Sequence, residues 1–395
     1  MESPDKCFIK QTGKTLVGIS GGGYSILEIF WLTAAIAELG VSVDVIQTVS
    51  SGALLGAKLI ETNFNLIEIN KILRKVIAGG PNVFKELYEL INSVEMSIEY
   101  ISKFNLDGLT FKGIKKLTNF KEYANLLEQM QRVKGLLKAY QKPYLLSHEP
   151  LERLIDEDLQ IDFTKLVNPN LPELQIITRN ETRCGPTIWS TRDPWVSPNI
   201  LRDVMVGTMC LVPAVEHKII FGEVHTDGQE LILSEFIAEG YQTIIVFFGG
   251  QLARTLTEEI VSKQTILQRL ISNFHTTINS RLVEELNYAH ANGYKIFCNN
   301  PDSVISKIDN PDPRSDDPFN KSSKISHLPK YLKDIKRPEG IEKQHKKVIL
   351  ITPKYPMPNL GLLGFNKETM EKDFDIFGKK NLEDAKEFLT KALLT

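Results

Sequence analysis

The sequence predicts an α/β fold with a largely parallel central sheet flanked by helices. Two runs rich in β-branched residues, Thr15–Ile19 and Val43–Val49, are each followed by a glycine-bearing turn. After each turn comes an apolar run rich in Ala, Leu and Ile that is long enough for a helix, Ile26–Leu39 and Ala53–Ile60. The repeated order of strand, turn and helix is typical of parallel strands joined by helical crossovers.

Further strand-like segments support the same fold class. They lie at Leu174–Thr178, Thr243–Phe248 and Lys347–Thr352, and long helical stretches such as Leu252–Ala291 separate them. Residues 63–147 have helical periodicity and little strand character, which predicts a helical insertion that caps the site. Residues 309–327 are rich in Asp, Pro, Ser and Asn without periodicity, and this predicts a mobile surface loop.

The second turn, Thr48-Val49-Ser50-Ser51-Gly52, carries a candidate nucleophile. A serine in a sharp turn between a strand and a helix has its hydroxyl exposed at the edge of the sheet. Glycine is expected nearby because a bulkier side chain would clash there. We therefore predict that Ser50 is the nucleophile. Its alternative role is that of an ordinary helix N-cap, which is common for serine before an apolar helix.

The first turn and a later dipeptide supply the other parts of a hydrolytic site. Gly21, Gly22 and Gly23 leave backbone N–H groups bare beside the positive end of a helix, where they would bind an oxyanion. Asp227-Gly228 precedes the apolar run Leu231–Ile237, and Asp227 is the candidate base. Alone, a glycine-rich turn also serves nucleotides, and Asp-Gly is most often a simple turn. Their combination in this order predicts a Ser–Asp dyad with an oxyanion hole.

At these residues the sequence resembles the patatin-like phospholipase family, whose Gly-Gly-Gly turn, Gly-x-Ser-x-Gly elbow and Asp-Gly dipeptide form a Ser–Asp dyad. Weaker similarities follow in the family's order at His148–Leu159, Val206–Pro213 and Val348–Phe365. The run Gly-Gly-Gly-Tyr is also similar to the related cytosolic phospholipase A2 group. The resemblance covers residues 14–392, which it implies form one lipid acyl hydrolase domain with a three-layer fold.

The resemblance implies a serine lipid acyl hydrolase of the phospholipase A or lysophospholipase type. Ser50 would attack a fatty-acyl ester, Asp227 would accept its proton, and Gly21, Gly22 and Gly23 would form the oxyanion hole. The implied substrate is a phospholipid, a lysophospholipid or a neutral acylglycerol. Neither a metal nor another cofactor is required, and a protein activator stays open.

The sequence departs from the family pattern at three positions. Thr48 occupies the first elbow position, where the family has glycine, and Tyr24-Ser25 follows the glycines where a basic residue is usual. Gln229 replaces a small residue after Asp-Gly. These departures leave an alternative function, namely a non-catalytic or partner-activated lipid-binding protein that keeps the fold with a degenerate elbow.

Two other kinds of site are less well supported. A Ser–His–Asp triad would use His275 or His290, which follow Asp227 in the order found in α/β-hydrolases but lie in a polar helical stretch. If the segment before Asp227 is extended, His225 would share a strand face with Asp227, and we interpret His225 as structural. A dinucleotide site would pair Gly21–Gly23 with Asp44, but its G-x-G-x-x-G pattern needs glycine at Ile26.

Composition limits the remaining function classes. The 395 residues are 42% hydrophobic, which is enough for a large core, and the formal net charge is −2. Because affinity for phosphate backbones depends on clustered Lys and Arg, this charge argues against a nucleic-acid partner. The four cysteines have no paired spacing, so neither a zinc site nor a disulfide framework is predicted.

Any membrane contact is predicted to be peripheral. The first thirteen residues carry charges without an apolar core, unlike a signal peptide, and the longest apolar run is too short to span a bilayer. We therefore expect a cytoplasmic protein, and the sequence does not distinguish action in its own cell from delivery into another. Residues 111–142 hold eight Lys and Arg against two Glu, which suits either an anionic membrane surface or a solvated helix.

Overall fold

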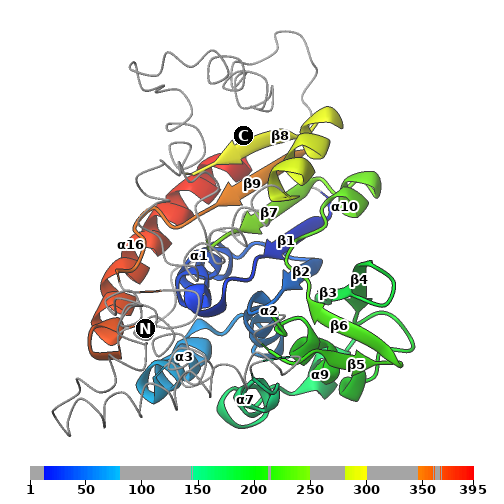
Figure 1. The fold of residues 1–395 in the computed structure, drawn as a ribbon. Coiled ribbons are helices and arrows are strands. Elements are labelled where there is room, and N and C mark those ends of the chain that lie inside the picture. The colour runs from blue at the N-terminus through cyan, green and yellow to red at the C-terminus, as the bar shows by residue number, and fades with distance from the viewer. Residues whose placement is uncertain are drawn as a thin grey trace, which may run out of the picture.

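The computed structural model shows a mixed α/β fold whose central sheet is mostly parallel and flanked by helices, which confirms the predicted fold class (Figure 1). The structure describes residues 13–80, 144, 146–211, 215–249, 281–299, 346–358, 360, 365 and 367–395. Most of the predicted cap at 63–147, including the basic stretch 111–142, and the whole predicted loop at 309–327 lie outside the described residues. His275 and Cys7 lie outside them as well.

The parallel part of the sheet comprises six strands in the order β3-β2-β1-β7-β9-β8. Their bounds are β1 Thr15–Ile19, β2 Val45–Val49, β3 Glu173–Asn180, β7 Thr243–Phe247, β8 Lys295–Cys298 and β9 Lys347–Ile351. The strand-like segments expected from the sequence therefore all lie in this part. The carboxyl ends of β1 and β2 meet at one edge of the sheet, since Ile19 pairs with Thr48.

An antiparallel extension adjoins β3. Strand β4 (Gly185–Ser190) pairs with β3, and β6 (Glu223–Asp227) also runs antiparallel to β3 and pairs with β5 (Lys218–Ile220). Because β6 runs against β3, it brings its last residue, Asp227, opposite Thr178 and close to the end of β2.

Side chains of the central strands alternate between two separate cores, so both faces of the sheet are covered. Val17 and Ile19 face one core, whereas Leu16 faces the other. Such alternation is expected from the period of two in a strand. In β7, Ile245 faces the same core as Val17, whereas Ile244 faces the same core as Leu16. The result is a three-layer arrangement of helices, sheet and helices.

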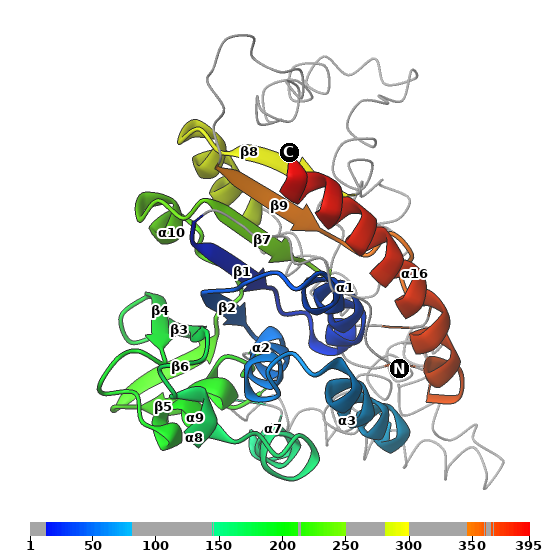
Figure 2. The same cartoon turned by 180° about the vertical axis from the view of Figure 1, so that it is seen from behind.

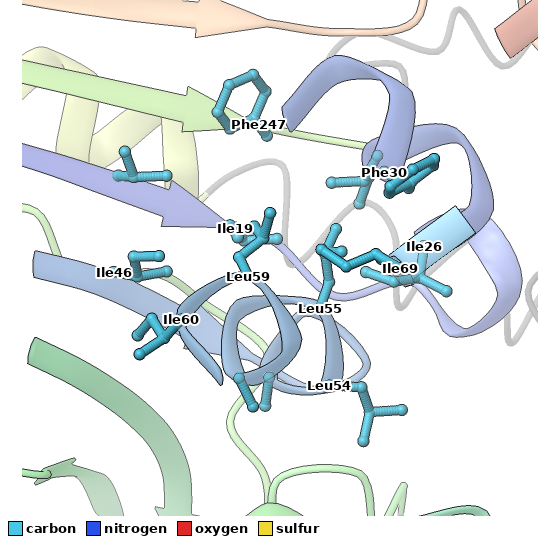
Figure 3. Close-up of a cluster of buried hydrophobic side chains, with 14 of the residues drawn as sticks. Ile19, Ile26, Phe30, Ile46, Leu54, Leu55, Leu59, Ile60, Ile69 and Phe247 are labelled. Atoms are coloured by element: carbon cyan, nitrogen blue, oxygen red, sulfur yellow. The ribbon is translucent and has the colours of Figure 1, made fainter. Parts of the chain in front are cut away.

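The larger core lies between the sheet and helices α1 (Ile26–Leu39), α2 (Gly52–Glu61), α3 (Leu66–Gly79), α9 (Pro198–Gly207) and α16 (Lys367–Leu394). Figure 3 shows Leu59 of α2 beside Ile19 at the end of β1, with Phe247 at the end of β7 in the same cluster. In Figures 1 and 2, α16 lies along β9 and α1. There Phe374 of α16 contacts Trp31 of α1 with ring centroids 5.3 Å apart.

Shorter elements complete the two helical layers. Helix α7 (Glu149–Arg153) continues into a π-helical turn (Leu154–Asp158) and is followed by α8 (Phe163–Leu166). On the opposite face, α10 (Ser234–Ala238) and a helix ending at 291 cover the sheet. Within the described ranges, no helix combines the length and the apolarity that crossing a membrane would require.

Candidate active site

Ser50 lies in a tight turn between the end of β2 and the start of α2, as its sequence context predicts. Its φ of 53° is in the left-handed region, which a non-glycine residue adopts only where neighbouring structure enforces it. The Ser50 amide donates a 2.9 Å hydrogen bond to Thr208 Oγ1, and the Thr208 hydroxyl donates to the Ile177 carbonyl at 2.5 Å. Thr208 therefore ties the strained turn to the neighbouring strand β3.

Glycines are required around Ser50 because three chain segments approach one another closely. A Cβ on Gly21 would lie 2.3 Å from Ser50 Cβ, and one on Gly52 would lie 2.6 Å from the carbonyl oxygens of Ile19 and Ser20. A Cβ on Gly228 would lie 2.3 Å from the Ile177 carbonyl oxygen. None of these positions tolerates a side chain without backbone movement.

The glycine turn presents its backbone toward Ser50. Gly22 and Gly23 have φ values of 138° and 56°, which suit glycine, and they lead through a short 3₁₀ turn (Gly23–Ser25) into α1. In the described part of the chain, the N–H groups of Gly21, Gly22 and Gly23 have no hydrogen-bond acceptor. All three glycines line the pocket that contains Ser50, so the turn is placed to bind negative charge there.

Asp227, the last residue of β6, is buried next to Ser50. The residue is only 4% exposed, and its carboxylate accepts a 2.9 Å hydrogen bond from the Gln229 amide. Burial raises the pKa of Asp227 from 3.8 to about 6, and the interactions of the carboxylate with the nearby Ser50 hydroxyl and with the Gln229 amide oppose this rise. The structure thus brings Ser50 and Asp227 into contact and gives the carboxylate more affinity for a proton than an exposed Asp has.

Thr48 fits the elbow without distorting it, because a compensating glycine lies opposite. Its hydroxyl donates a 2.9 Å hydrogen bond to the Gln175 carbonyl of β3. Its methyl group faces Gly56 of α2, where an added Cβ would lie 2.5 Å from Thr48 Cγ2. The β-branched residue that departs from the family pattern is therefore fully buried and accommodated.

The residues after the glycine turn have structural contacts in place of a basic side chain. The Ser25 hydroxyl donates a 2.7 Å hydrogen bond to the Gly22 carbonyl and so closes the turn. The Tyr24 ring is buried edge-on against Phe365, with centroids 5.0 Å apart. Gln229 adopts a φ of 62° while its amide contacts Asp227. Two of the three departures from the family pattern, Tyr24-Ser25 and Gln229, thus lie in the turns that carry the glycines and Asp227.

A pocket lined mainly by apolar side chains extends from the Ser50–Asp227 pair. Its lining comes from α2 together with α1, α3, α7 and the π-helical turn. The apolar lining from α2, α3, α7 and this turn consists of Leu54, Leu55, Ile69, Ile72, Leu73, Val76, Leu151, Leu154 and Leu159. The α3 residues fall at the start of the predicted cap at 63–147, but the sequence did not single out the individual lining residues, since each is also an ordinary member of an amphipathic helix.

The far part of the α2 face ends at a buried ion pair. Lys58, which is 4% exposed, lines the pocket and contacts Glu61 at 2.8 Å, while its ammonium also donates to the Gln160 carbonyl at 3.2 Å. Both charges are thereby compensated within the protein, as burial requires. Lys58 thus forms an ion pair with Glu61 in the last turn of α2, and it does not lie beside the glycine turn.

The described histidines do not form a triad with Ser50. His225 is buried, with its Nδ1 2.9 Å from the Thr178 hydroxyl and its ring against Trp189, and burial lowers its pKa. His290 is exposed and is not among the residues that line the pocket. Asp44, considered above for a dinucleotide, accepts the Thr15 amide at 2.7 Å. Among the described residues, Asp227 is therefore the titratable group that interacts with Ser50.

Comparisons with known proteins add two distant structural neighbours. The chain is similar to VipD from Legionella pneumophila, with 14% identity, a TM-score of 0.34, and coverage of 97% of this chain and 67% of that one. It is also similar to full-length ExoU, solved with full-length SpcU from the type III secretion system of Pseudomonas aeruginosa, with 12% identity and a TM-score of 0.23. That match covers 71% of this chain and about half, 53%, of the other. No family model and no curated protein matches the sequence.

Replacing Thr48 by glycine is expected to lower the free energy of unfolding by about 2 kcal/mol. The variant loses the hydrogen bond to Gln175 and the methyl contact with Gly56, and it gains backbone freedom in the unfolded chain. Gly56→Ala should also destabilise the protein, and the two changes together should cost less than their sum. Urea unfolding of the four proteins measures this coupling, and strict additivity would contradict the contact.

Asp227→Asn is expected to make the folded protein more stable than wild type above about pH 6. Because the folded pKa lies above the unfolded one, protonated Asp227 stabilises the fold fully below about pH 3.8 and this contribution is lost as the pH rises through about 6. A shift of about two pKa units corresponds to at most roughly 3 kcal/mol. Denaturant unfolding of both proteins between about pH 3.8 and pH 7 tests this pH dependence. Glu157→Gln removes an exposed carboxylate and serves as the control for loss of charge alone. A stability difference between Asp227→Asn and wild type that does not change with pH would refute the shift.

Proposed function

We propose that this protein is a serine hydrolase that cleaves fatty-acyl esters of lipids. The observation that carries the proposal is the position of the Ser50 hydroxyl beside the buried Asp227 carboxylate, in the wall of one apolar pocket. A nucleophile in contact with a base whose pKa is raised toward neutrality is the arrangement that nucleophilic catalysis requires. Residues 14–392 would form the hydrolase domain.

The first half-reaction transfers the acyl group to the protein. Ser50 Oγ attacks the ester carbonyl carbon while its proton moves to Asp227, and the carbonyl oxygen becomes an oxyanion. The N–H groups of Gly21, Gly22 and Gly23 would bind this oxyanion, since they have no acceptor in the described part of the chain. When the intermediate collapses, the carbon–oxygen bond to the alcohol breaks and the Asp227 proton passes to the leaving oxygen.

The second half-reaction releases the fatty acid. A water molecule gives a proton to Asp227 and its oxygen attacks the acyl carbon, and the Ser50 ester bond then breaks with return of that proton to Oγ. The balance requires only the ester and water, so the residues in the site need no metal or cofactor for this route. The raised pKa of Asp227 helps both steps, because a carboxylate with an ordinary pKa accepts protons poorly near neutral pH.

The pocket supports an acyl lipid as the substrate class. Its lining from α2, α3 and α7 is dominated by Leu and Ile, which favour a hydrocarbon chain over a polar one. A phospholipid, lysophospholipid or acylglycerol would place its ester at Ser50 and its chain among these residues. Such substrates are encountered at a membrane surface, where the protein would act peripherally. A protein activator remains compatible with this proposal.

A lipid-binding protein without catalysis is the second candidate, and the apolar pocket alone would suit it equally well. The contact between Ser50 and Asp227 favours the hydrolase, because a pure binding site has no need of a strained serine beside a buried carboxylate. The fit of Thr48 against Gly56 also removes the steric reason for considering the elbow degenerate.

Wild-type protein is expected to release fatty acid from mixed phospholipid vesicles, and Ser50→Ala is expected to release none above background. A fluorophosphonate should label wild type once, at Ser50, because only an activated serine reacts readily. Liquid chromatography of the lipids and intact-protein mass spectrometry give the two readouts. Asp227→Asn should retain the fold but lose both reactions by at least about a hundredfold.

Ser234→Ala is a matched control, since it removes a serine hydroxyl on α10, at the opposite face of the sheet. Circular dichroism establishes that each variant is folded. If Ser50 is labelled but no lipid is cleaved, the assignment of Ser50 as the nucleophile would stand and a missing activator would explain the absence of lipid release. A folded wild type that neither reacts with the probe nor releases fatty acid would favour the lipid-binding alternative.

Ester hydrolysis is expected to increase with pH as Asp227 loses its proton, with a midpoint near 6 in kcat/KM. Only the ionised carboxylate can accept the Ser50 proton, so the rate should be low at about pH 5 and level above about pH 7. The measurement uses a soluble p-nitrophenyl ester with the product quantified after adjustment to one pH. A rate that is independent of pH over this range would exclude Asp227 as the base.

A further inference from the structure

Ser51, the neighbour of the proposed nucleophile, carries a buried hydroxyl without a protein partner. The residue is 7% exposed, and its Oγ has no hydrogen-bond partner in the described part of the chain. A buried hydroxyl that forms no hydrogen bond costs about 1–3 kcal/mol. This group therefore needs an explanation other than the stability of the free protein.

The expected structural role of Ser51 is absent. Ser51 is the N-cap residue of α2, where a serine hydroxyl normally accepts a hydrogen bond from an N–H in the first helical turn, but it forms no such bond. Other caps in this protein do form it: Asn65 accepts the Glu68 amide, and Ser197 accepts the Ile200 amide at 3.3 Å. Ser51 is thus an N-cap serine whose hydroxyl is not used for capping.

Ser51 is one of the residues that line the pocket of Ser50 and Asp227. The charged side chains there interact within the protein: Asp227 with the Ser50 hydroxyl, and Lys58 with Glu61. Going along α2, the next residues that line the pocket are Leu54 and Leu55, which offer no acceptor. Ser51 is therefore a donor without an acceptor, one residue from the attacking oxygen and at the start of the apolar lining.

We propose that the Ser51 hydroxyl donates a hydrogen bond to an oxygen of the bound acyl ester. This rests on the proposed function and extends it from the dyad to the recognition of the substrate. The oxygen lies close to the carbonyl that Ser50 attacks, and it belongs either to the cleaved ester itself or to the adjoining alcohol part, as in an ester of glycerol. The hydroxyl that is unsatisfied in the free protein then becomes satisfied in the complex.

Ser51→Ala separates this role from a structural one, because the two roles move stability in opposite directions. The variant should have a Tm equal to or above that of wild type, since it removes an unsatisfied buried hydroxyl. Its kcat/KM should decrease about tenfold, the loss expected for one hydrogen bond to the substrate. Ser197→Ala is the matched control: it removes a hydroxyl that caps α9, so its Tm should fall while kcat/KM stays unchanged.

Two substrates distinguish the source of the oxygen. A loss of kcat/KM with both p-nitrophenyl butyrate and dibutyryl phosphatidylcholine assigns the contact to the cleaved ester, and a loss with the phospholipid alone assigns it to the glycerol part. Unchanged kcat/KM with both substrates would overturn the proposal. So would a Tm decrease like that of Ser197→Ala, because the hydroxyl would then serve the fold.

Binding without turnover keeps this test independent of catalysis. Calorimetric titration of dibutyryl phosphatidylcholine into Ser50→Ala and into the double variant Ser50→Ala with Ser51→Ala should show about tenfold weaker binding for the double variant. That difference would support the Ser51 contact even if wild type hydrolysed nothing, in which case the proposed function alone would fail. Equal affinities beside a wild type that hydrolyses esters would overturn the Ser51 contact and leave the hydrolase.

Discussion

The site depends on how closely three turns approach one another at the carboxyl end of β2. Gly21, Gly52 and Gly228 allow backbone from distant parts of the chain to pass within van der Waals contact of Ser50 or its neighbours. Thr208 then holds the Ser50 amide, so the positive φ of Ser50 is imposed by hydrogen bonding and packing together. Without this crowding, the serine would relax into an ordinary helix N-terminus and lose its contact with Asp227.

Much of the fold follows from local patterns. Strand β1 and helix α1 have the bounds that the β-branched and apolar runs predict, and β2 begins two residues later than expected. These elements are strongly patterned and buried, so periodicity and final structure agree. The antiparallel strands β4 and β5 were not anticipated, and an extended segment at β6 was considered only for the relation of His225 to Asp227. Their pairing depends on contacts with β3 or with one another rather than on their own short sequences.

The candidate site shows the same division between local and long-range information. The glycine turn, Ser50 and Asp227 could be selected from sequence because each is part of a short motif, although their catalytic roles stay a proposal. The role of Thr208 could not be selected, since its hydrogen bond to Ser50 joins residues far apart in sequence. The only hint in the sequence was that Thr208 lies within Val206–Pro213, one of the segments with a weaker resemblance to the patatin-like family. The accommodation of Thr48 depends likewise on Gly56, whose meaning is visible only across the strand–helix contact.

Burial makes the proposed base both useful and costly. The same loss of hydration that raises the pKa of Asp227 disfavours its ionised form at neutral pH, so the fold is less stable where the carboxylate is able to act. The unsatisfied Ser51 hydroxyl adds a second local cost in the same pocket. Costs of this kind are characteristic of functional sites, where stability of the free protein is not the property being optimised.

The antiparallel pairing of β6 with β3 also determines when the two members of the proposed dyad meet during folding. Ser50 belongs to an early strand–helix unit, whereas Asp227 arrives on β6, which must first pair with β3. Pairings between residues so distant in the chain form slowly relative to local helices. A polypeptide that is still being synthesised, or that has lost this edge of the sheet, therefore carries a serine without its base. The proposed reactivity of Ser50 would therefore be a property of the completed sheet and not of the segment that contains the serine.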